Sequence, residues 1–178
     1  MPGQQIQALT VKHNGRANQI ITDLRVSVAY DPKSPPDPLP TEVSTKALWD
    51  TGASKSVISQ DLAKQLNLTP VGATNVIHAG GSSVSPTHMV NFYLPHGAKV
   101  IGVLVTEFAA SPQFGAIGGM DIITIGDFAI TNVGGETVMS FRLPSIETID
   151  YVEVANKQNR PPVTGKQKKK GSPWGFIR

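Results

Sequence analysis

Hydrophobic and polar residues alternate over many short stretches of the 178-residue chain, which is the period of half-buried β-strands. The clearest stretch is residues 20–30, where Leu24, Val26, Val28 and Tyr30 recur at every second position. Further strands are predicted at residues 6–12, 43–49, 74–79, 84–94, 99–106, 127–133 and 137–143. Many short strands separated by turn residues indicate a mainly β barrel or sandwich.

Turn residues separate these predicted strands. The Asn14-Gly15 pair is a hairpin signal after the first strand, and Gly134-Gly135 predicts a hairpin between the last two. Residues 31–40 hold five prolines, which lack amide donors, so this segment is predicted to be a loop. Residues 79–82 (Ala-Gly-Gly-Ser) predict a hairpin-like turn between two strands.

Two segments change to the helical period. In residues 57–68, Ile58, Leu62 and Leu66 fall on one stripe, and Ser59 is the expected N-cap. Residues 120–126 predict a second, short helix, with Asp121 as its possible cap. The predicted fold therefore has one or two short helices among its strands.

Composition changes near the C-terminus. Residues 157–173 combine Pro161-Pro162, glycines and a lysine run, which is typical of a flexible tail. The sequence thus predicts a domain over residues 1–156 and a basic tail over 157–178. The tail holds seven basic residues and no acidic one, which leaves nine basic against 13 acidic residues in the domain. An acidic domain is not a basic nucleic-acid-binding domain, although the Lys166–Lys170 run leaves an acidic partner for the tail open.

Other classes are excluded by what the sequence lacks. It has no apolar run near the roughly 20 residues of a spanning helix and no basic-then-apolar start, so neither membrane nor signal segment is expected. It has no cysteine, which excludes a disulfide, a cysteine-ligated metal and a thiol nucleophile. A cytoplasmic protein is the simplest interpretation.

The stretch richest in chemistry is Ala47-Leu48-Trp49-Asp50-Thr51-Gly52-Ala53-Ser54. An apolar strand leads directly into a carboxylate, a hydroxyl and a glycine, a position where the chain turns and presents the carboxylate. Asp-Thr-Gly is also ordinary turn chemistry, so the triplet alone leaves both interpretations open.

The sequence resembles the retropepsin-like aspartic proteases, the single-lobe relatives of retroviral protease, as a cellular or bacterial-type member. Three elements in order carry the resemblance over roughly residues 43–143: residues 48–54 with the helical segment after them, the glycine turn Ala79-Gly80-Gly81, and Ala116-Ile117-Gly118-Gly119 leading into a short helix. It implies a mainly β, closed-barrel subunit that acts as a homodimer and cleaves extended peptides without a cofactor or metal.

The resemblance also implies roles for individual residues. Asp50 would be the catalytic aspartate, Thr51 would tie two active-site loops together across a dimer axis, and Gly52 would offer backbone contact to substrate. Ala53 and Ser54 would line the substrate site. The turn holding Ala79, Gly80, Gly81 and Ser82 would be the flap that closes over the peptide. Gly118 and Gly119 would let the chain pass close behind the Asp50 loop.

The mechanism implied needs two aspartates, and no other aspartate is followed by Thr-Gly or Ser-Gly. A homodimer with one Asp50 from each chain would supply the pair, in keeping with closed two-fold symmetry. Residues 146–155 have strand character and are predicted to extend the dimer sheet.

Three departures from the viral pattern favour a cellular or bacterial-type relative and leave a second hypothesis open. The acid–base pair of the viral enzymes is missing at Ser54 and Met120, and Trp49 is bulky for its position. Ser54 and Asp121 are expected to form a hydrogen-bonded link instead, unless Asp121 caps its helix. The alternative is a protease-like dimerisation or peptide-binding domain with weak or no catalysis, and a weaker one is a scaffold whose basic tail holds nucleic acid.

Other site classes have less support. His13, His78, His88 and His96 show no close metal spacing and are interpreted as surface or turn residues. Gly80-Gly81-Ser82-Ser83 lacks the Gly-Lys-Ser/Thr of a phosphate loop, and no serine lies in a G-x-S-x-G elbow.

Overall fold

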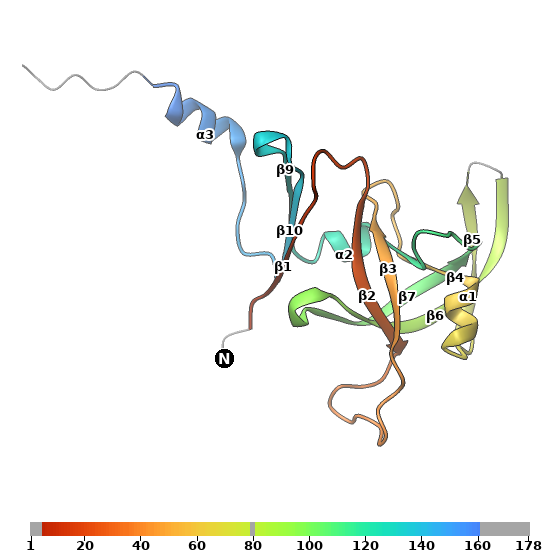
Figure 1. Ribbon diagram of the computed structural model, residues 1–178. Coiled ribbons are helices and arrows are strands. Elements are labelled where there is room, and N and C mark those ends of the chain that lie inside the picture. The colour runs from red at the N-terminus through yellow and green to blue at the C-terminus, as the bar shows by residue number, and fades with distance from the viewer. Residues whose placement is uncertain (1–4, 79–80, 161–178) are drawn as a thin grey trace, which may run out of the picture. The chain divides into compact units, whose positions relative to one another are not determined.

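The computed structural model describes residues 5–78 and 81–160. The strands of this part of the chain form two β-sheets, one of seven strands and one of three (Figure 1). Internal contacts divide the chain into two compact units, one ending at Glu147 and the other beginning at Thr148. The predicted boundary after residue 156 stays a prediction.

The larger sheet has seven strands in the order β2-β3-β8-β4-β7-β6-β5. Their bounds are β2 Ile20–Val28, β3 Val43–Trp49, β4 Val57–Ser59, β5 Gly72–His78, β6 Gly81–Tyr93, β7 Lys99–Phe108 and β8 Ala116–Gly118. An additional antiparallel pairing joins β2 to β6, so the sheet closes on itself. The predicted mainly β, closed-barrel fold is confirmed.

The smaller sheet has the order β1-β10-β9, with β1 at Gln7–Lys12, β9 at Asp127–Thr131 and β10 at Val138–Leu143. The hairpin predicted between the last two strands is confirmed. The hairpin expected at Asn14-Gly15 is wrong, because β1 pairs with β10 instead, Leu9 opposite Phe141. The Gly15 carbonyl accepts a hydrogen bond from the Thr137 amide, so this turn is fastened to the chain before β10.

Two short helices flank the barrel strands, α1 at Gln60–Gln65 and α2 at Met120–Ile123. The Ser59 cap is confirmed, since its hydroxyl accepts from the Leu62 amide at 3.2 Å. The predicted helix began too early, because residues 57–59 form β4, which pairs with both β7 and β8. Asp121 does not cap α2, whose N-cap is Gly119. The single-turn helices η1 and η2 lie at Pro95–Gly97 and Val133–Gly135.

The second unit contains α3, at Tyr151–Gln158. The strand predicted over residues 146–155 is therefore wrong. Asp150 caps the helix by accepting hydrogen bonds from the amides of Val152 and Glu153, and Glu153 pairs with Lys157 one turn later. These local interactions outweigh the β-branched composition of the segment. None of the described helices is long and apolar enough to cross a membrane.

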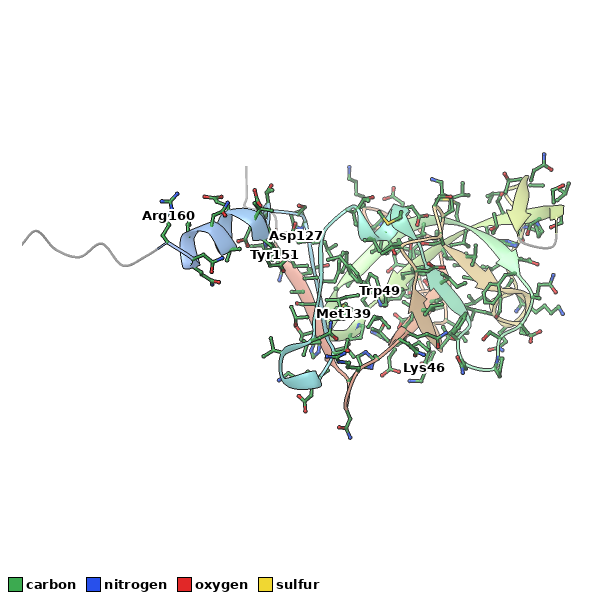
Figure 2. All side chains as sticks on the ribbon, turned by 90° about the horizontal axis from the view of Figure 1, so that it is seen from above. Lys46, Trp49, Asp127, Met139, Tyr151 and Arg160 are labelled. Carbon is green, nitrogen blue, oxygen red and sulfur yellow. The ribbon has the colours of Figure 1, made fainter. Side chains whose placement is uncertain are left out.

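One apolar core runs from the barrel into the smaller sheet. Leu24 and Val26 of β2 and Phe92 of β6 are buried in it, together with Met139 and Phe141 of β10. Figure 2 shows Trp49 and Met139 in this interior. The two sheets thus share a core, which fixes β9 and β10 against the end of β3.

Candidate active site

Asp50 follows the last residue of β3, where that strand runs parallel to β8. The Asp50 amide continues the ladder by donating to the Gly118 carbonyl at 3.0 Å. The chain then turns, and the Ala53 amide donates back to the Asp50 carbonyl at 3.2 Å. The sequence thus places a half-buried carboxylate at the point where a core strand ends.

The Asp50 carboxylate is held by its own turn. Its Oδ1 accepts a hydrogen bond from the Gly52 amide at 2.8 Å. A Cβ on Gly52 would lie 3.2 Å from the same oxygen, which is tighter than most such contacts. Thr51 and Gly52 are exposed beside Asp50, so the three predicted catalytic residues lie together at one surface turn. The Asp50-Thr51-Gly52 triplet therefore forms an ordinary turn and also presents a carboxylate that can have a functional role.

The next two residues differ in their environments. Ala53 is half-buried, and its carbonyl accepts a hydrogen bond from the Met120 amide at 2.8 Å. Ser54 is exposed. The predicted link between Ser54 and Asp121 is wrong, because Asp121 binds a different serine, two residues further along.

That serine is Ser56, which is fully buried. Its hydroxyl donates to Asp121 Oδ1 at 2.7 Å, and its amide donates to Asp121 Oδ2 at 3.0 Å. The same hydroxyl accepts from the Gly119 amide at 3.1 Å. Both carboxylate oxygens and the serine hydroxyl are satisfied, as buried polar groups must be. The network fastens the Asp50 loop to the start of α2.

Gly119 allows the two segments to approach each other. A Cβ at this position would lie 2.7 Å from the carbonyl carbon of Lys55 and 2.8 Å from the carbonyl oxygens of Ala53 and Lys55. These are backbone atoms of the Asp50 loop, so only glycine fits. At Gly118 a Cβ would meet just the Leu48 carbonyl, at 3.9 Å. The predicted close passage behind the loop is confirmed for Gly119 and is not needed at Gly118.

Trp49 points away from the turn and into the core. It is 7% exposed, its ring stacks on Phe128 at 5.5 Å between centroids, and Phe141 lies at 5.0 Å. Its indole N–H donates to the Thr22 hydroxyl at 3.0 Å. The bulk of Trp49 therefore fills the space between β3 and the smaller sheet and leaves the Asp50 turn free.

A cavity of about 320 Å³ adjoins Asp50 and Thr51. Asn18, Gln19 and residues of β2 and β3 form part of its wall, and Phe128 and Ile130 of β9 complete it. Ile130 is 46% exposed. Asp50 is the single acidic residue in the lining. The Asp50 turn and β9 thus border the same cavity.

The predicted flap corresponds to the β5–β6 hairpin, which projects from the barrel in Figure 1. His78 pairs with Gly81, whose φ of +123° favours glycine, and Ile77 pairs with exposed Ser82. Ala79 and Gly80 lie outside the described residues, so their predicted contacts with substrate stay predictions.

The described residues bring together no group of three histidine, aspartate or glutamate side chains suited to a metal ion. His88 is not the surface or turn residue expected, because it is buried and its Nε2 lies 2.8 Å from Glu107 Oε1. Its neighbours on β6 and β7 belong to the barrel wall.

The clearest electrostatic shift lies at the start of β9. The Asp127 carboxylate accepts hydrogen bonds from the Ser145 hydroxyl, the Ile146 amide and Arg142 Nε, and in that order these lower its pKa to about 2. Arg142 also contacts Glu147 at 2.9 Å. This cluster ties the segment after β10 to the strand that borders the Asp50 cavity.

Sequence reasoning missed Ser56 and its role. It lies among Ser54, Lys55 and Val57 with no motif around it, and its partner Asp121 is 65 residues away. The one signal available was the Gly118-Gly119 pair before Asp121, which marked a close approach but did not name the segment approached.

Comparison with known proteins gives two findings. The sequence model of a family described as aspartyl protease matches residues 41–138, more than half of the chain. Among solved structures, the crystal structure of a retropepsin-like aspartic protease from Rickettsia conorii is similar, with 12% sequence identity and a TM-score of 0.47 over 78% of this chain and 93% of that one. No curated protein matches the sequence.

Proposed function

Because the chain belongs to the aspartyl protease family, we propose that it is an aspartic endopeptidase that cleaves extended peptides. The observation that supports this most directly is the placement of Asp50. It is half-buried at the end of a core strand, with Oδ1 fixed by the Gly52 amide and the turn fastened to α2 from behind. A rigid loop of this kind holds a carboxylate ready for acid–base work.

In the proposed reaction two Asp50 carboxylates lie close together and share one proton, because two like charges at short distance do not both ionise easily. The ionised carboxylate takes a proton from a water molecule, whose oxygen attacks the peptide carbonyl carbon. The protonated carboxylate gives its proton to the carbonyl oxygen. The carboxylate that took the proton from water then gives it to the amide nitrogen, a hydroxyl of the tetrahedral intermediate returns a proton to the other carboxylate, and the C–N bond breaks.

The second Asp50 would come from a second copy of the chain. Among the described residues, Asp50 is the single acidic one that lines its cavity, so this part of the chain does not provide a partner carboxylate there. The cavity reaches Ile130 on β9, and β9 is an outer strand of its sheet among the described residues. An outer strand has unpaired backbone groups that another strand can bind. We propose that two copies meet along β9 and bring their Asp50 turns together on a two-fold axis.

The β5–β6 hairpin would cover the substrate. Its arms run antiparallel from Gly72–Thr87 to His78–Gly81. An extended peptide between the hairpin and the Asp50 turn would bind through backbone hydrogen bonds, as an added strand does.

The alternative, an inactive protease-like domain that binds peptides, rested on Trp49, Ser54 and Met120. Trp49 is packed in the core, and the Ser56–Asp121 pair provides a link between the Asp50 loop and α2. These observations favour the active enzyme over the alternative.

The experiment is cleavage of an unbiased peptide pool at pH 3–7 by wild type and by Asp50→Asn, with sedimentation velocity on the same samples. Asp23→Asn is the matched control, because Asp23 is 82% exposed on β2. We expect activity that follows the dimer population and is lost in Asp50→Asn alone. A dimer that cleaves nothing at any pH would favour the peptide-binding alternative, and activity retained in Asp50→Asn would exclude the proposal.

A further inference from the structure

A second cavity, of about 210 Å³, lies at the other end of the Asp50 loop. Lys55 borders it, five residues after Asp50. Asp121 and Ile122 of α2 and residues 100–104 of β7 form its remaining walls. The loop from Asp50 to Lys55 thus borders both cavities, one at each of its ends.

The backbone of Lys55 is fixed, although its side chain is exposed. Gly119 packs against its carbonyl group, and the next residue, Ser56, is hydrogen-bonded to Asp121 through both its amide and its hydroxyl. A long cationic side chain therefore extends from a rigid base at the rim of the cavity.

The walls opposite Lys55 are apolar. Ile101 and Leu104 of β7 are 37% and 50% exposed. Between them, Gly102 has a φ of +71°, and its amide donates to Asn91 Oδ1 at 3.0 Å, where the β6–β7 register shifts. Such irregularities bend a strand and are frequent next to functional sites. Gly102 itself lines the cavity.

Lys55 has no ion-pair partner in the described part of the chain, although the carboxylate of Asp121 lines the same cavity. Among the described residues it forms none of the ion pairs within 4 Å. Asp121, the one acidic residue of the lining, has both oxygens engaged by Ser56. In an otherwise acidic domain, an unpaired lysine beside exposed aliphatic side chains is suited to an incoming carboxylate with an aliphatic stem.

We propose that this cavity is a subsite for an acidic side chain of the substrate, glutamate above all, with Lys55 binding the carboxylate and Ile101 and Leu104 contacting its methylene groups. The proposal rests on the proposed function, because it assumes a peptide centred on Asp50. An extended peptide advances about 3.3 Å per residue, so a chain of some eight residues reaches along the whole loop.

The test compares matched peptides that carry Glu, Gln or Lys at each position around one cleavage site, at pH 6 and low salt. We expect wild type to prefer Glu over Gln at one position by about two- to fivefold in kcat/KM, the effect of a partly exposed ion pair. Lys55→Glu should reverse the preference in favour of Lys, and 0.5 M salt should reduce both effects. Lys64→Glu, an exposed lysine of α1, is the matched control and should keep the wild-type preference.

A second measurement separates this proposal from the proposed function. Binding of the same peptides to Asp50→Asn, with and without Lys55→Glu, is followed by fluorescence anisotropy. A Glu preference in binding that Lys55→Glu reverses supports the subsite even if wild type cleaves nothing. Equal Glu and Gln affinities, or a preference that Lys55→Glu leaves unchanged, would overturn the subsite even if wild type is an active protease.

Discussion

Ser56 binds both carboxylate oxygens of Asp121, one through its hydroxyl at 2.7 Å and the other through its amide at 3.0 Å. The two residues stand 65 positions apart and join the loop that presents Asp50 to the helix behind it. Since the Ser56 hydroxyl also accepts from the Gly119 amide, one small side chain binds both the N-cap and the first turn of α2. The position of Asp50 depends on this connection.

Ser56→Ala removes the hydroxyl and leaves a half-buried carboxylate oxygen of Asp121 and the buried amide of Gly119 without this partner. We expect the free energy of unfolding to fall by about 1–3 kcal/mol, the usual cost of an unsatisfied buried polar group. Ser54→Ala is the matched control, because Ser54 is exposed and should change stability by less than about 0.5 kcal/mol. Urea denaturation of both variants checks this, and equal midpoints would contradict the network's role.

Gly119→Ala places a methyl group within 2.8 Å of backbone atoms of Ala53 and Lys55. Because backbone atoms do not rotate away, the Asp50 loop must move, and we expect about 1–3 kcal/mol of destabilisation together with loss of peptide cleavage. Gly118→Ala is the control, with 3.9 Å to the nearest atom. Thermal unfolding and cleavage assays compare the two. If Gly119→Ala equalled wild type in both thermal unfolding and cleavage, the space between residue 119 and the Asp50 loop would be larger than the structure shows.

The pKa of Asp127, lowered from 3.8 to about 2, makes one region of the protein sensitive to acid. A carboxylate whose pKa is lower in the folded state stabilises the fold fully above about pH 4, and this contribution is lost as the pH falls through about 2. Asp127→Asn should therefore be less stable than wild type at pH 6, with the difference shrinking towards pH 2. Urea denaturation at pH 6, 4 and 2.5 measures it.

Ser145 gives a second check on the same carboxylate, because its hydroxyl is the largest cause of the lowered pKa. Ser145→Ala should raise the pKa of Asp127 towards 3.8, which an NMR titration of the carboxyl carbon measures directly. An unchanged titration would show that Arg142 and the Ile146 amide alone hold the charge. With a pKa of about 2, Asp127 stays ionised over most of the pH 3–7 range proposed for activity assays.

Ile130→Asp tests the dimer surface. If two copies meet along β9, the new carboxylate is buried without a partner, and the dimer dissociation constant should rise roughly tenfold or more, equivalent to about 1.4 kcal/mol. Leu39→Asp, in the proline-rich loop and 59% exposed, should leave association unchanged. Sedimentation velocity over a concentration series measures both. Equal dissociation constants would place the interface elsewhere.

Local signals in the sequence predicted local structure well. Ser59 caps α1, the Asp50 turn forms beside Gly52, and the Gly134-Gly135 hairpin closes, because each depends on residues within a few positions. The alternation in β2 was visible for the same reason, with Leu24 and Val26 buried on one face.

Pairings between distant segments were not visible. β1 binds β10 instead of its neighbour, and Asp121 binds Ser56 instead of Ser54, since backbone partners and buried hydrogen bonds are chosen by the assembled core. At residues 146–155 the β-branched composition was misleading, because the Asp150 cap and the Glu153–Lys157 pair stabilise a helix locally. The composition of a short exposed segment is a weak guide when a cap is present.

The parallel pairing of β3 with β8 also determines when the Asp50 site can form during folding. Contacts between residues so far apart in sequence form slowly, because a long loop must close before they contribute. During synthesis, at about 5–20 residues per second, Asp50 emerges several seconds before Asp121 is added. The nascent chain therefore carries Asp50 and its loop before Gly119 and Asp121, which hold the loop in place, have been added. We expect proteolytic competence to arise only after most of the chain has left the ribosome.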